Sequence, residues 1–208
     1  RLRPEGSKGP LVSTVDSFRS YYARGAAFWE FQALLKARPV AGDKQAGKLF
    51  MNMAAETLMA RGHEVKASDI IQMRERIQRE LSKEAEGYDV KLGPGGIEEI
   101  EFAIQFLQLK NCRKDKGLLV QSTLVAMERL YAAEIIDSAT RDSLRDAYLF
   151  FRRLESFLRL CGESILKRDR DVLKNTSDYI GLDSVDAFVE TLHGYRENIR
   201  QIVERTLL

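Results

Sequence analysis

The sequence predicts an all-α protein: a helical bundle with one short extended loop segment that carries a Gly-Pro-Gly-Gly turn. Two observations support this fold class. Apolar residues recur every three or four positions through most of residues 44–208, which is the spacing of one buried face of an α-helix. The periodicity stops at residues 88–96, where three glycines and a proline mark a turn. One prominent loop is therefore expected inside an otherwise helical chain.

The N-terminal part of the chain predicts two short helices after a strand end. Residues 1–4 alternate basic and apolar side chains and stop at a proline, which is typical of a strand that ends there. Ser13 and Asp16 have the spacing of a capping box and predict that a helix begins at this point. A second helix is expected over about residues 26–37, because Pro39 disfavours helical geometry in the residue before it.

From residue 44 onward the chain is expected to be helical almost throughout. Gly62 and Gly181 stand where helices are expected to end. Ser68 and Ser184 stand where helices are expected to begin. The predicted helices cover residues 44–61, about 68–84, 97 to about 110, a segment from Gly117, 137–160, 169–180 and 184–208.

The helix expected from Ile97 has apolar residues over most of its circumference. A helix with this pattern packs at the centre of a bundle rather than at its surface. We therefore expect Ile100, Ile104 and Leu107 to be buried. The two apolar stripes consist of Ile97, Ile100, Ile104 and Leu107, and of Phe102, Phe106 and Leu109.

The composition restricts the kinds of protein that this chain can represent. Its 33 basic and 31 acidic residues give a net charge of +2, which argues against a surface for nucleic acid or for an anionic membrane. No apolar run approaches the roughly 20 residues needed to span a bilayer. Cys112 and Cys161 belong to no paired motif, so we expect reduced thiols and a cytoplasmic protein.

Other groups with catalytic or metal-binding potential have simpler structural interpretations. Asp169 and Asp171 have the spacing of a two-metal site, but they open a predicted helix, where aspartate stabilises the helix dipole. His63 and His193 have no second histidine or cysteine at ligand spacing. We therefore predict no catalytic residue and no metal site within this chain.

Three arginines, Arg152, Arg153 and Arg159, lie on one predicted helix together with Glu155. A functional basic stripe is one interpretation of this pattern. We favour the other interpretation, an exposed face on which residues three positions apart form ion pairs.

The glycine turn is the strongest candidate for a functional site. Glycines allow positive φ and close approach of other groups, and three free N–H groups at the start of the following helix are expected to attract an anion. Against this, Glu98, Glu99 and Glu101 crowd the same helical turn and would repel a phosphate. A phosphate-binding turn and a plain loop before an acid-rich helix both remain open. The candidate phosphate-binding residues are Lys91, Gly93, Gly95 and Gly96.

The amino-acid sequence of this stretch resembles the Lys-x-Gly-x-Gly-Gly-Ile-x-Asp/Glu-Ile-Glu-Phe signature of glutamine synthetase adenylyltransferases. The first fifty residues are similar to the same family in the segments Arg-Leu-Arg-Pro, Gly-Pro-Leu-Val-Ser, Trp-Glu-x-Gln-Ala-Leu and Lys-Ala-Arg-Pro-Val-Ala-Gly-Asp. The family usually has arginine where this chain has Glu98. That departure removes one potential phosphate contact.

The resemblance implies that residues 1–43 are the tail end of a nucleotidyltransferase domain with connecting helices, and that residues 44–208 are a helical bundle domain. The catalytic acids of the family precede Arg1, so the chain is expected to be a fragment that is inactive alone and binds no cofactor by itself. Arg1 and Arg3 lie beside those acids and are further candidates for nucleotide binding. In a second interpretation the turn is a hinge, and the three glutamates bind arginines such as Arg1 or Arg3.

For the whole enzyme, the resemblance implies transfer of AMP from ATP to a tyrosine of glutamine synthetase with Mg²⁺, regulated by glutamine and a PII signal protein. The expected partners are glutamine synthetase, the PII protein and the nucleotidyltransferase domain. Residues 162–166 lack the Gln-Thr-His-Thr-Leu-Pro segment of the deadenylylating half, which favours the adenylylating, C-terminal half. The sequence Lys-Leu-Gly-Pro-Gly-Gly favours the deadenylylating, N-terminal half.

Two hypotheses from outside this activity also remain. The chain is then either a non-catalytic module that docks glutamine synthetase or PII, or part of the related uridylyltransferase that modifies PII.

Overall fold

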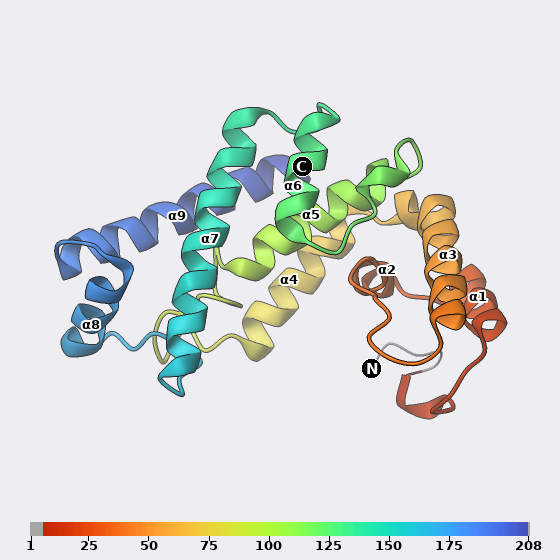
Figure 1. Ribbon diagram of the computed structural model, residues 1–208. Helices are drawn as coiled ribbons and strands as arrows, with labels where there is room; N and C mark the ends of the chain where they lie inside the picture. Colours follow the sequence, from red (N-terminus) through yellow and green to blue (C-terminus); the bar gives the residue numbers. More distant parts are fainter. Residues whose placement is uncertain (1–5, 208) are drawn as a thin grey trace. The chain divides into compact units, whose positions relative to one another are not determined.

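The structure is a computed structural model that describes residues 6–207 (Figure 1). Within these residues the regular structure is helical, and the β-pairing consists of one isolated antiparallel bridge between Tyr88 and Leu166. The predicted all-α class is therefore confirmed. The α-helices are α1 (Val15–Arg24), α2 (Phe28–Leu35), α3 (Lys44–Arg61), α4 (Ala67–Leu81), α5 (Ile97–Asn111), α6 (Thr123–Ala132), α7 (Ser138–Leu160), α8 (Arg170–Ile180) and α9 (Val185–Leu207), and the 3₁₀ turns are η1 (Gly6–Lys8), η2 (Gly62–Glu64) and η3 (Lys116–Leu118).

The chain divides into two compact units. Unit 1 contains the described residues up to Ile70 together with Ile104–Ile135, and unit 2 contains Ile71–Ala103 with the described residues from Ile136 onward. Helices α4 and α5 thus contribute residues to both units. The boundary between residues 43 and 44 that the family resemblance implies remains a prediction.

Side chains predicted to cap helices do so at several boundaries. The Asp137 carboxylate accepts a hydrogen bond from the Thr140 N–H at 2.7 Å, and α7 begins at the next residue. At the end of α8, Gly181 adopts the left-handed conformation with φ of 87°. The Ser184 hydroxyl accepts a hydrogen bond from the Ala187 N–H at the start of α9.

Three predicted helix starts are wrong. Thr14 rather than Ser13 caps α1, because Thr14 is the residue in extended conformation whose side chain accepts from the Ser17 N–H. Helix α4 begins at Ala67, before Ser68. The segment from Gly117 is a 3₁₀ turn, because Asp115 accepts from the Gly117 N–H; the helix itself, α6, starts only after Ser122.

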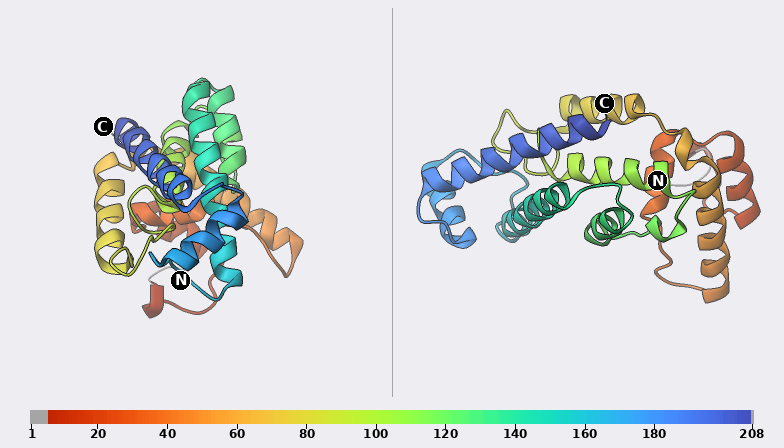
Figure 2. Two further views of the ribbon diagram at one scale, coloured as in Figure 1. Left: turned by 90° about the vertical axis from the view of Figure 1, so that its left-hand side faces the viewer. Right: turned by 90° about the horizontal axis from the view of Figure 1, so that it is seen from above.

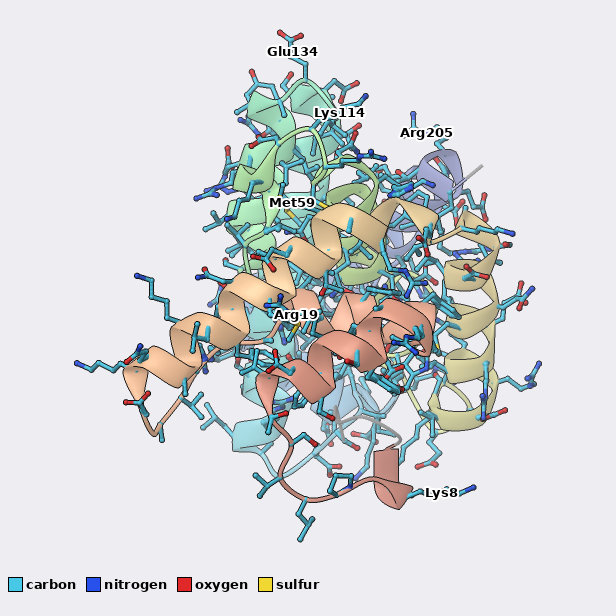
Figure 3. The ribbon with its side chains drawn as sticks, turned by 90° about the vertical axis from the view of Figure 1, so that its right-hand side faces the viewer. Lys8, Arg19, Met59, Lys114, Glu134 and Arg205 are labelled. Carbon is cyan, nitrogen blue, oxygen red and sulfur yellow. The ribbon has the colours of Figure 1, made fainter. Side chains whose placement is uncertain are left out.

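In unit 1, helices α1, α2 and α3 pack around an aromatic core. Tyr22 and Phe31 are 2% and 3% exposed. Figure 3 shows α1 beside α3 with Arg19 at their contact, where its guanidinium lies 3.7 Å from the Glu56 carboxylate. In unit 2, helices α7, α8 and α9 pack on one another (Figure 2). None of the helices in residues 6–207 is long and apolar enough to cross a bilayer.

Helix α5 is buried along much of its length, as predicted, but the buried face differs from the predicted one. Ile100 and Ile104 are 0% and 1% exposed. Leu107 is only half-buried, so its predicted burial is wrong. The face continues instead through Gln108, four residues after Ile104, whose amide donates to the carbonyls of Leu118 (2.6 Å) and Val120 (3.0 Å). The buried position one turn after Ile104 is thus taken by a polar residue whose amide group is hydrogen-bonded.

Replacing Ile104 by alanine is expected to lower the free energy of unfolding by about 2–5 kcal/mol, because the side chain is buried and leaves a cavity. Leu107→Ala on the same helix is the control and should cost less, since Leu107 is half-buried. Urea unfolding followed by circular dichroism measures both changes. A loss below about 0.5 kcal/mol for Ile104→Ala would place the core elsewhere.

Candidate functional site

The loop of residues 82–96 joins α4 to α5 within unit 2, and we refer to it as the signature loop. Its path is set first by Asp89, which is buried. The Asp89 carboxylate accepts hydrogen bonds from three backbone N–H groups, those of Lys83 (3.0 Å), Lys91 (3.1 Å) and Leu92 (2.9 Å). An aspartate that binds the backbone two and three residues ahead folds the chain into a turn. The turn before the glycines is therefore fixed by a local side chain.

The start of α5 is closed by the signature loop itself. The Ile97 N–H donates to the Val90 carbonyl and the Glu98 N–H donates to the Lys91 carbonyl, each at 3.1 Å. The expectation of three free N–H groups at this helix start is therefore wrong for these two. The physical reason is that buried backbone donors need partners, and the extended residues before the turn supply them.

Each glycine of the signature stands where a side chain has no space. Gly95 has a φ of +68°, and a Cβ there would lie 2.6 Å from the Cα of Arg196 on α9. A Cβ on Gly93 would lie 2.9 Å from the Arg196 guanidinium, and one on Gly96 would meet three carbonyl oxygens at 2.9 Å. The N–H groups of Gly93 and Gly96 donate to carbonyls of the loop, at 2.9 and 3.0 Å. The glycines thus allow the loop to pack against α9 and against itself.

Arg196 holds the signature loop from α9. Its guanidinium makes a bidentate pair with Glu84, at 2.7 and 2.9 Å, and donates to the Asp89 carbonyl at 2.9 Å. Bidentate pairs of this kind combine charge with a fixed direction and are among the stronger hydrogen-bonded contacts. Arg196 is only 8% exposed, and the Glu84 carboxylate is the opposite charge that pairs with it.

A second arginine, Arg168, holds the beginning of the loop. It donates to the carbonyls of Glu84 (3.0 Å) and Gly87 (3.3 Å), and its guanidinium lies 4.8 Å from the centre of the Tyr88 ring. Tyr88 also exchanges two backbone hydrogen bonds with Leu166, at 2.7 and 3.0 Å. The loop is therefore joined to the segment after α7 as well as to α9.

The glutamates of α5 are paired with residues of unit 2. Glu99 is buried; it accepts from the Gln78 amide at 2.6 Å and lies 3.7 Å from Arg74. Glu101 accepts from Arg152 of α7 at 3.1 Å. The predicted pairing with Arg1 or Arg3 lies outside the described residues, as do those two arginines themselves.

The predicted ion pair between residues three positions apart is confirmed for Arg152 and Glu155, at 2.7 Å. Arg159, four positions after Glu155, also pairs with it, at 2.6 Å. The prediction of a plain exposed face is wrong for two of these residues. Glu155 is 8% exposed, and Arg152 reaches Glu101 of α5. The sequence pattern could not show this second contact, because it joins helices that are distant in sequence.

Lys91 and Glu98 are two charged signature residues whose side chains reach solvent. Lys91 is exposed and Glu98 is half-buried. Burial raises the pKa of Glu98 to about 7, and the neighbouring charge of Lys91 acts in the opposite direction. The signature thus presents the Lys91 ammonium group to solvent, together with the Glu98 carboxyl group, whose raised pKa favours its neutral form.

The remaining candidates from the sequence are an aspartate that caps a helix and two exposed histidines. The Asp169 carboxylate caps α8 by accepting from the N–H groups of Asp171 (3.0 Å) and Val172 (3.2 Å). His63 and His193 are exposed. Among residues 6–207 there is no group of three or more histidine, cysteine, aspartate and glutamate residues placed to hold a metal ion.

Sequence reasoning missed Glu84 and Arg196. One signal was available for Arg196, which stands in the apolar stripe of α9 between Leu192 and Ile199. A charge at a position that periodicity assigns to the core requires a buried partner. The partner itself could not be read from the sequence, because Glu84 is 112 residues away.

Comparison with known proteins assigns the chain to a family. Residues 1–53 match the model of the glutamate-ammonia ligase adenylyltransferase family, and residues 69–207 match that of the GlnD PII-uridylyltransferase family.

Similar curated proteins are bifunctional glutamine synthetase adenylyltransferase/adenylyl-removing enzymes. The protein of Cutibacterium acnes is 39% identical over 189 residues, which cover 89% of this chain and 19% of the relative. That of Streptomyces coelicolor is 36% identical over 211 residues, covering 98% of this chain and 21% of the relative. The chain thus spans about a fifth of the length of these relatives. It belongs to the glutamine synthetase adenylyltransferase family, and its residues 69–207 are of a type that also matches the PII-uridylyltransferases.

Proposed function

We propose that the chain is the helical part of an enzyme that transfers AMP from ATP to a tyrosine of glutamine synthetase. The observation that carries the proposal is the 36% identity to a bifunctional glutamine synthetase adenylyltransferase/adenylyl-removing enzyme over 98% of this chain. We assign the chain to the adenylylating half, on the absence of the Gln-Thr-His-Thr-Leu-Pro segment at residues 162–166. The deadenylylating half is the alternative. The expected partners are glutamine synthetase and a PII protein in the cytoplasm.

Within that activity, Lys91 is the residue that we propose to contact a phosphate of the nucleotide. Its side chain is exposed, and the loop that carries it is fixed by Asp89. Direct phosphate binding by Gly93, Gly95 and Gly96 remains a prediction, as does binding by Arg1 and Arg3. The hydrogen bonds of the Gly93 and Gly96 N–H groups to carbonyls favour an indirect role for these glycines, in which they allow the packing that places Lys91.

ATP and Mg²⁺ are expected in the whole enzyme. The described residues do not fit a Mg²⁺ site, because no three or more histidine, cysteine, aspartate and glutamate residues among them are grouped to hold a metal ion, and we derive no step through the metal. The proposal is that the acids which bind the metal come from another part of the enzyme. The chain alone should then bind no cofactor and transfer no AMP.

A second candidate function is transfer of UMP to a PII protein, which the family match over residues 69–207 favours. Against it stand the adenylyltransferase match over residues 1–53 and the relatives that cover nearly the whole chain. A third possibility is a non-catalytic module that docks glutamine synthetase or PII.

The test uses the full-length protein with Mg²⁺ and α-labelled ATP or UTP, offered to glutamine synthetase and to PII in parallel. We expect label from ATP on glutamine synthetase and none from UTP on PII. The reverse pattern would establish the uridylyltransferase, and label on neither protein would leave the docking module. Residues 1–208 alone should give no labelled product, and turnover by them would contradict the proposed origin of the catalytic acids.

A further inference from the structure

Arg196 is a charged residue inside the core of unit 2. It lies on α9 between Leu192 and Ile199, which are both 0% exposed, and is itself 8% exposed. Burying a charge is unfavourable unless the charge is paired and hydrogen-bonded, and an apolar residue of similar size would often stabilise such a site as well or better. Stability alone therefore does not account for an arginine at this position.

The contacts of Arg196 lead to Lys91 in two steps. Its guanidinium binds the Glu84 carboxylate at both oxygens and the Asp89 carbonyl. Asp89 donates its N–H to Glu84 at 2.9 Å and accepts the N–H of Lys91 at 3.1 Å. The Lys91 N–H is thus bonded to Asp89, and Arg196 holds Asp89 by two routes. It binds the Asp89 carbonyl directly, and it binds the Glu84 carboxylate that accepts the Asp89 N–H.

We propose that Arg196 is a positioning residue that fixes the signature loop from α9 so that Lys91 meets a phosphate group of the nucleotide. This inference rests on the proposed function for its reaction and on the hydrogen bonds above for its geometry. The planar guanidinium suits the role, since it binds two oxygens of Glu84 and one of Asp89 in fixed directions, which a single ammonium group does not do.

Arg200 supplies a matched control. It lies on α9, one turn after Arg196, and its guanidinium pairs with Glu197 of the same helix at 3.4 Å. Its side chain is 50% exposed. Removing Arg200 therefore takes away a guanidinium from the same helix and leaves the contacts of Arg196 with Glu84 and Asp89 in place.

The experiment measures KM for ATP and kcat of the full-length enzyme in four forms: Lys91→Ala, Arg196→Ala, the double variant and Arg200→Ala. We expect Lys91→Ala and Arg196→Ala each to raise KM for ATP, or to lower kcat/KM, about tenfold. The double variant should be no worse than Lys91→Ala alone, because a residue that acts through Lys91 has nothing left to position. Arg200→Ala should change kcat/KM by less than about threefold.

Hydrogen exchange of the Lys91 and Leu92 amides, which both donate to Asp89, gives a second readout. These amides should lose protection in Arg196→Ala and keep it in Arg200→Ala. Glu84→Gln keeps the size of its side chain and should shift KM and exchange in the same direction, so it serves if Arg196→Ala does not fold.

Two results would overturn the inference: multiplicative effects of Arg196→Ala and Lys91→Ala in the double variant, or unchanged exchange at Lys91 in folded Arg196→Ala. Failure of the proposed function is a separate result. If the wild-type enzyme transfers no nucleotide, that function is wrong, while the exchange rates still decide whether Arg196 positions the loop.

Discussion

Gly95→Ala is expected to destabilise unit 2 by at least about 4 kcal/mol, a loss in the exceptional range for a single substitution. Two effects add at this position. The φ of +68° is unfavourable for a residue with a Cβ, by about 1–2 kcal/mol. The added methyl would also lie 2.6 Å from the Cα of Arg196, so α9 or the signature loop has to move.

Gly162→Ala separates these two effects. Gly162 has a similar φ of +76°, but nothing lies within 4 Å of the place that its Cβ would take. It should therefore cost only the conformational strain, about 1–2 kcal/mol. Denaturant unfolding of both variants gives the comparison, and equal losses would show that the contact of the loop with α9 contributes nothing.

Lys91→Ala is expected to raise KM for ATP or lower kcat of the full-length enzyme by tenfold or more, about 1.4 kcal/mol. Stability should remain nearly unchanged. The Lys91 side chain is exposed, and the hydrogen bonds that this residue contributes to the loop come from its backbone, through its N–H to Asp89 and its carbonyl to Glu98. Steady-state kinetics and a thermal unfolding curve measure the two properties.

Lys83→Ala is the matched control for this variant. Lys83 is an exposed lysine of the same loop, and its N–H also donates to the Asp89 carboxylate. It should leave both kinetic constants within about twofold of the wild type. If Lys91→Ala is as silent as Lys83→Ala, the phosphate role of the signature lysine is wrong and its loop has a structural role alone.

Local features of the sequence were sufficient to predict most of the fold. The start of α7 follows from Asp137 and the end of α8 from Gly181, and the effects of both residues act within three or four residues. The place of the signature loop follows from its glycines. Where such rules failed, a nearby competitor decided the outcome, as when Thr14 capped α1 in place of Ser13.

Pairing between distant segments could not be predicted. The partner of Arg196 is Glu84, far away in sequence. The burial of Gln108 in place of Leu107 depends on carbonyls at Leu118 and Val120, which no periodicity reveals.

The free N–H groups expected at the start of α5 follow from a general property of helix ends, but here the Val90 and Lys91 carbonyls accept two of them. These two N–H groups are therefore bonded within the loop, while phosphate binding by the turn stays a prediction.

Hydrogen exchange at the start of α5 tests most directly whether the signature loop is fixed before any nucleotide binds. The N–H groups of Ile97 and Glu98 donate to the Val90 and Lys91 carbonyls. In the full-length enzyme without nucleotide, both amides should exchange at least about a hundredfold more slowly than unstructured peptide, and ATP should change them little. Fast exchange without nucleotide, with protection appearing only when ATP is added, would contradict a preformed loop. It would indicate instead that these N–H groups bind a phosphate.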